Sequence, residues 1–174
     1  AIYRYFVERI VLAEDGGLDV LAPVNTPGRP VAVHGDLVYS IEPRYVDDSH
    51  LAIALHRSVL RDGGAYIEQS ADIGGGYTDA HAIGEHLFVL SGPPEWCAED
   101  AHAELFAVSL ASTDFARGDT LELPGIQWRF PLGPSLDESG ALLLLGGPLP
   151  QGRLFIDIGD PMRPRIERYT NTTE

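Results

Sequence analysis

Short runs of apolar residues, separated by turn-forming residues, recur along the whole chain. In the segment "HLFVL" (86–90), four successive apolar residues follow a turn at Gly84 and Glu85. A strand that is apolar on both faces must be covered on both sides, as strands are in stacked sheets. The segment "LHRSVLRDGG" (55–64) is too short for an amphipathic helix and ends on two glycines. The pattern therefore predicts an all-β protein.

One longer pattern, a glycine turn followed by two apolar strands, occurs three times. Its copies begin with "AVHGDLVYSI" (32–41), "HAIGEHLFVL" (81–90) and "LDESGALLLLG" (136–146). The turn glycines, which are 49 and 56 residues apart, are Gly35, Gly84 and Gly140. The strands that follow carry the aligned leucines Leu51, Leu105 and Leu154. We expect a positive φ at the three glycines, because glycine adopts it at little cost. A degenerate period of about fifty residues with several short strands is typical of β-propeller blades.

The copies divide the chain into about four blade-like repeats within one domain, residues 1–174. A partial copy near 1–24 has two strands on either side of the turn 14–17, and further strands are expected at 66–70 and 120–123. The fuller copies lie near 25–74, 75–125 and 126–174. Four blades can close a small propeller, and the alternative is part of a seven- or eight-bladed ring. The length of the copies and a start directly in a strand favour the larger ring, completed by a second chain.

The last copy contains the most specific motif of the sequence, "LFIDIGDPMRPRIERY" (154–169). A strand ends in Asp157, a turn follows with the residues Asp160, Pro161 and Pro164, and a second strand carries Tyr169. This order resembles the LVIVD-type propeller repeat of bacterial and archaeal surface or secreted proteins. The other copies depart from it, since Ala54 and Val108 replace the strand aspartate. The resemblance implies a propeller used for binding or scaffolding, located at the cell surface, in the periplasm or outside the cell. It supplies no catalytic residues.

The charge of the chain is strongly negative. There are 26 acidic and 12 basic residues, which gives a formal net charge of −14. Such a chain repels the phosphate backbone, so nucleic acid is not an expected partner. The longest apolar run, 141–145, is too short to span a bilayer, and we expect no membrane insertion. Cys97 is the single cysteine, which excludes an intrachain disulfide and a thiol-rich zinc site.

No cofactor is expected from the sequence, apart from a divalent metal ion that histidines and carboxylates of the copy at 75–125 could bind. Asp79, His81 and Glu85 would share one face of an extended strand, an arrangement that suits a metal. Gly84 interrupts that strand, and His86 has the wrong parity to join His81 on a regular strand. A polar turn at a blade edge is therefore the favoured interpretation.

The loop "WCAEDAH" (96–102) brings further ligand types together. Cys97 and His102 could bind a transition metal, but their spacing matches no recognised zinc or copper motif. An ordinary acidic loop is the favoured interpretation here too. The candidate metal ligands are His81, His86, His102 and Asp79.

Candidate contacts to a partner protein lie in loops and turns. Trp96 follows two prolines, and Tyr77 follows three glycines. Arg117 and Asp119 belong to an Arg-Gly-Asp tripeptide, an integrin ligand in animals, although these residues are also ordinary turn chemistry. His50 and His56 flank an apolar strand and are expected at strand ends near water, rather than along a channel.

These features favour a non-catalytic binding or assembly module, which would use rim loops or a blade face to contact a partner protein. The alternative is a propeller enzyme with a metal near its central channel, held by His81, His86 or His102 and nearby carboxylates. The sequence leaves open whether the protein is an enzyme.

Overall fold

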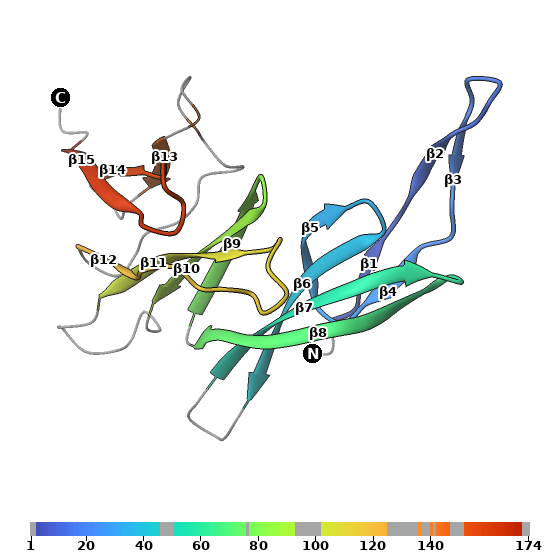
Figure 1. Ribbon diagram of the computed structural model, residues 1–174, viewed down its shortest axis with the longest axis horizontal. Helices are drawn as coiled ribbons and strands as arrows, with labels where there is room; N and C mark the ends of the chain where they lie inside the picture. Colours follow the sequence, from blue (N-terminus) through green and yellow to red (C-terminus); the bar gives the residue numbers. More distant parts are fainter. Residues whose placement is uncertain are drawn as a thin grey trace. The chain divides into compact units, whose positions relative to one another are not determined.

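The computed structural model of the protein describes residues 3–45, 51–75, 77–92, 102–124, 136, 140, 142–146 and 152–171. All regular elements in these residues are β-strands, which confirms the predicted all-β class (Figure 1). Across the described part of the chain there is no helix long and apolar enough to cross a membrane. The chain divides into two compact units, residues 1–73 and 74–174.

The first unit begins with a long hairpin-like ribbon, residues 5–26, in which each of the two sides consists of two short strands. Its strands are β1 (Tyr5–Val7), β2 (Ile10–Leu12), β3 (Leu18–Val20) and β4 (Val24–Thr26). β1 pairs with β4 and β2 with β3, both antiparallel, and the Leu21 amide donates to the Arg9 carbonyl between the two pairs at 2.9 Å. The turn between β2 and β3 has a positive φ at Gly16, as glycine allows. The strands expected on either side of residues 14–17 are therefore present.

The rest of the first unit forms a four-stranded antiparallel sheet, here called the first sheet, whose last two residues, 74 and 75, belong to the second unit. Its strands in spatial order are β5 (Arg29–His34), β6 (Leu37–Tyr45), β7 (Leu51–Arg61) and β8 (Gly64–Gly75). Val7 and Val24 of the ribbon pack on Val38 and Leu60 of this sheet. This contact fixes the β1–β4 end of the ribbon on the sheet, and Figure 1 shows the β2–β3 end extending away from it.

The second unit contains two more sheets built in the same strand order. The second sheet consists of β9 (Tyr77–Ile83), β10 (His86–Gly92), β11 (Ala103–Ser109) and β12 (Leu121–Leu123). The third sheet consists of β13 (Leu142–Gly146), β14 (Gly152–Asp157) and β15 (Arg165–Asn171). A bridge from Leu136 to Leu143 gives Leu136 the place that β9 holds in the second sheet.

The three aligned glycines occupy the same turn in each sheet. The φ angles of Gly35, Gly84 and Gly140 are +62°, +56° and +70°, which confirms the expected backbone conformation. The predicted alignment of Leu51 with Leu105, in contrast, is wrong. Leu105 pairs with the residue six positions after its turn glycine, and the corresponding pair in the first sheet is Ile41 with Leu55, not Leu51. The connections before these strands differ in length, and this shifts their registers.

The second and third sheets pack face to face around one apolar core. Phe88, Leu90 and Leu105 lie on one face of the second sheet, and they belong to the same buried core as Leu145 and Leu154 of the third. This core covers one face of β10, and Leu87 and Val89 on the other face are also buried, as the sequence pattern of a strand that is apolar on both faces predicts.

The segment that resembles the LVIVD-type repeat forms the predicted strand, turn and strand. β14 ends at Asp157, whose carboxylate accepts a hydrogen bond from the Gly159 amide at 2.8 Å. Asp160 accepts a second one from the Met162 amide at 3.1 Å, and β15 contains Tyr169. The two aspartates thus fix the turn by bonding the backbone two residues ahead.

Candidate functional site

Each of the three sheets has four fully buried positions in equivalent places on its two central strands. They are the residues three and five positions after the turn glycine, together with the residue that each of them pairs with on the next strand. In the second sheet these positions hold Leu87, Val89, Phe106 and Val108. In the third sheet they hold Leu143, Leu145, Leu154 and Ile156.

The first sheet is polar at three of the same four positions. Val38 is apolar, but Ser40, His56 and Ser58 take the places of aliphatic and aromatic residues, and all four are 0% exposed. A buried polar group costs free energy unless it is hydrogen-bonded. This face of the first sheet is therefore the first candidate site, because two serines and a histidine stand where the other two sheets have apolar residues.

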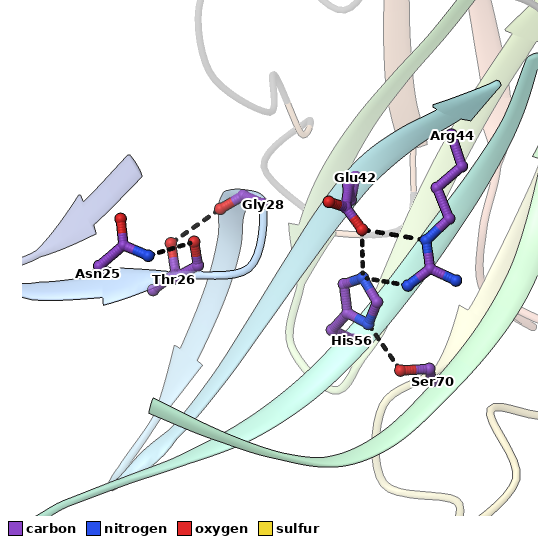
Figure 2. Close-up of polar contacts among 7 residues, drawn as sticks. All are labelled: Asn25, Thr26, Gly28, Glu42, Arg44, His56 and Ser70. Atoms are coloured by element: carbon purple, nitrogen blue, oxygen red, sulfur yellow. Dashed lines mark hydrogen bonds and ion pairs between the residues drawn. The ribbon is translucent and has the colours of Figure 1, made fainter. Parts of the chain in front are cut away.

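The imidazole of His56 lies in a line of hydrogen-bonding groups that crosses three neighbouring strands (Figure 2). Its Nδ1 is 2.6 Å from the Ser70 hydroxyl on β8, and its Nε2 is 3.2 Å from the Glu42 carboxylate on β6. Arg44 donates from Nε to the same Glu42 oxygen at 3.0 Å, and its Nη2 lies 3.3 Å from His56 Nε2. We call Glu42, His56 and Ser70 the polar line.

The charge state of Glu42 follows from its neighbours. Partial burial raises the pKa of this carboxyl, but the hydrogen bonds from Arg44 and His56 and the charges of these two residues lower it by more. The net effect is a pKa below the ordinary value of 4.5. Glu42 is therefore ionised at neutral pH, and its negatively charged carboxylate lies beside Nε2 of the imidazole.

The two buried serines next to His56 are not satisfied in the same way. Ser40 lies directly opposite His56, and Ser58 lies two residues further along β7 on the same face. Neither hydroxyl has a hydrogen-bond partner among the described residues. An unpaired buried hydroxyl is a destabilising feature that an apolar residue would not have.

A second candidate site is a shallow pocket of about 290 Å³ in the second unit. Phe106 and Arg117 line it, with His102 and Glu104 nearby on the chain that leads to Phe106. Ser91 and three glycines, Gly74, Gly75 and Gly92, complete the lining. The Arg117 guanidinium carbon lies 3.7 Å from the centre of the Phe106 ring, a cation–π contact.

Two of the residues predicted from the sequence meet in this pocket. Arg117, a candidate partner contact, and His102, a candidate metal ligand, both line it. Asp119 is exposed, and its amide donates to the Met162 carbonyl at 2.8 Å. Gly118 between them donates to the Ala107 carbonyl at 2.9 Å. The backbone of the Arg-Gly-Asp segment is thus hydrogen-bonded to two other segments of the chain, at Ala107 and at Met162.

The candidate ligands Asp79, His81 and His86 lie on the hairpin of β9 and β10. Phe88 pairs with His81, and Leu90 with Asp79. His86 pairs with Ile83, so the hairpin places it on the same face as His81, and the parity argument from the sequence is wrong. That argument counted along one strand, whereas the chain turns between the two histidines. Within the described residues, no three His, Cys, Asp or Glu side chains form a group that could hold a metal ion.

Several predicted residues lie outside the described residues. Trp96, Cys97 and His50 are among them, and Tyr77 is described only as the first residue of β9.

His56 was expected at a strand end near water, and this is wrong, because it is fully buried in the middle of β7. The sequence could have indicated that His56 is buried, because it aligns with Phe106 of the second sheet. That alignment is visible only when the register of β7 against β6 is known.

The sequence was compared with known proteins. No protein-family model matches it, and no curated protein shows significant similarity to it.

Proposed function

We propose that this protein is a non-catalytic binding and assembly module, and that the β2–β3 end of its ribbon packs against the β-sheet of another polypeptide. The observation that carries the proposal is one exposed aliphatic face. Ile10 pairs with Val20, and Leu12 pairs with Leu18, so all four side chains lie on the same side of the ribbon. Each of them is between 63% and 71% exposed.

The opposite side of the same strands is mixed, since Val11 there faces Asp19. A two-stranded hairpin alone is only marginally stable in water, and a contiguous exposed aliphatic patch marks an interaction surface. Both outer edges of β2 and β3 are unpaired in the sheets that the structure describes, which adds free backbone groups for pairing. A second sheet stacked on the aliphatic face would remove this surface from water.

The partner that fits this face is a β-sheet with an apolar surface, and we propose that it completes a propeller ring. Two arguments support the ring. The three sheets share their strand order, and the second and third stack face to face as neighbouring blades do. The resemblance of residues 154–169 to the LVIVD-type repeat supports the same proposal and a place at the cell surface, in the periplasm or outside the cell.

Sizing of the protein in extracts of cells that make it naturally tests the proposal. We expect the 18.9 kDa chain to elute in a larger complex, and a variant with Leu12→Thr and Leu18→Thr to elute at the size of the chain alone. Threonine keeps a high strand propensity while it removes the aliphatic surface. Val11→Thr on the opposite side is the matched control and should elute with the wild type. Elution of the wild type as the single chain, or no change in the double variant, would overturn the proposal.

A further inference from the structure

We propose that Ser70 is an activated hydroxyl, a covalent modification site at which neutral acyl or phosphonyl electrophiles react with the help of His56 and Glu42. This inference is independent of the assembly role proposed above. It rests on the polar line, in which a hydroxyl, an imidazole and a carboxylate are linked in that order. A nucleophile within hydrogen-bond reach of a base, with the base oriented by a third group, is the arrangement that activates serine.

The exposure of the three groups suits a reaction at the hydroxyl. Ser70 is exposed on β8, which is an edge strand of the first sheet, whereas the ring of His56 is 0% exposed. An electrophile in solution therefore meets the hydroxyl and not the imidazole. The short distance of 2.6 Å between Ser70 Oγ and His56 Nδ1 is within the range for proton transfer.

The tautomer of His56 follows from the charge of Glu42. In the neutral imidazole, the ionised carboxylate 3.2 Å from Nε2 favours a hydrogen on that nitrogen, because a lone pair there would face the anion, whereas the Arg44 Nη2 donor at 3.3 Å favours the lone pair. Nδ1 then carries the lone pair and accepts the Ser70 proton. Arg44 remains bound to the Glu42 oxygen, which it contacts at 3.0 Å, a shorter distance than the 3.3 Å from its Nη2 to the imidazole. Glu42 is thus a positioning residue, and His56 is the base.

With an aryl ester, the balanced step is an acyl transfer. Ser70 Oγ forms a bond to the acyl carbon while its proton moves to His56 Nδ1. The bond from the acyl carbon to the phenolic oxygen then breaks, and the phenol leaves with the proton from Nδ1. The products are an acylated Ser70 and a free phenol, and His56 has returned to the protonation state in which it began. A neutral electrophile is favoured, because the chain carries a net charge of −14 and Glu42 lies beside the base.

A fluorophosphonate probe tests this site, with its attachment mapped by peptide mass spectrometry and its rate by intact mass. We expect single labelling at Ser70, no label in Ser70→Ala, and a rate about a hundredfold lower in His56→Gln. Ser112→Ala is the matched control, since among the described residues the Ser112 hydroxyl bonds the Ser109 carbonyl and the Ala116 amide, both backbone groups, and its rate should equal that of the wild type. Labelling spread over several serines, or a rate at Ser70 that does not depend on His56, would overturn the proposal.

A second measurement keeps the test decisive if His56→Gln does not fold. Nitrogen NMR shifts of the imidazole report its tautomer directly, and we expect a hydrogen on Nε2 in the wild type. Glu42→Gln should lower the labelling rate and populate the other tautomer, while circular dichroism confirms the sheet content. A wild-type imidazole protonated only on Nδ1 would contradict the proposal, since that nitrogen could not accept the Ser70 proton.

Discussion

At the scale of single residues, the first sheet differs from its neighbours because polar side chains occupy core positions. His56 has the place of Phe106 and Leu154, and it is tolerated there because both ring nitrogens have partners. Ser40 and Ser58 have the places of valines in the second sheet, and neither hydroxyl is paired among the described residues. The same backbone position thus accommodates an apolar or a polar group, and hydrogen bonding decides the cost.

The unpaired serines give a prediction about stability. Ser58→Val, which introduces the residue found at Val108, should raise the free energy of unfolding by about 1 kcal/mol because it removes an unpaired buried hydroxyl. Urea denaturation measures the change. Ser58→Ala separates loss of the hydroxyl from added volume and should also stabilise. A destabilised Ser58→Val protein would show that the hydroxyl is satisfied or that the site has no room.

Glu42 gives a prediction about pH. Its pKa in the folded protein lies below the ordinary value of 4.5, so the unfolded chain binds the proton more tightly. The stability contributed by the carboxylate is therefore fully present above about pH 4.5 and is lost as the pH falls through the lower, folded pKa. Denaturation midpoints of wild type and Glu42→Gln should differ at pH 7 and converge in acid. A difference that grows as the pH falls would contradict this sign.

At the scale of elements, turns were more predictable than registers. Gly35, Gly84 and Gly140 could be found from the sequence because a local conformation requires glycine at each of them. The polar line could not, because it depends on which residue of β7 lies opposite Ser40, and that register is set by long-range pairing. The same reason explains why the leucine alignment failed although the strands themselves were correctly placed.

The connection that contains Gly118 is tightly packed, and this yields a prediction. A Cβ at Gly118 would lie 2.5 Å from the Met162 carbonyl oxygen, which is backbone and cannot rotate away. Gly118→Ala should therefore lower the free energy of unfolding by about 1–3 kcal/mol, as overpacking does. Gly159→Ala is the control, because its Cβ would meet only a side-chain oxygen of Asp157, at 3.2 Å. Equal thermal stability of the two variants would show that the connection can move.

At the scale of the whole molecule, the sequence period predicted about four blade-like repeats, and the structure shows an all-β chain in which three sheets share one strand order, in two compact units. The ribbon was predictable only in part. Its two strands could be predicted from the turn at 14–17, but its exposure could not, because apolar residues such as Leu12 and Leu18 ordinarily indicate a core. Their exposure is what makes the β2–β3 end an expected interface.

Photo-crosslinking tests that interface most directly. A photoreactive phenylalanine analogue at Leu12, on the aliphatic face, is compared with the same analogue at Asp19, on the opposite side. In cells that make the protein naturally, we predict one adduct of discrete mass from position 12 and none from position 19. No adduct from position 12, or equal adducts from both positions, would contradict the claim that the aliphatic face of the ribbon binds another polypeptide.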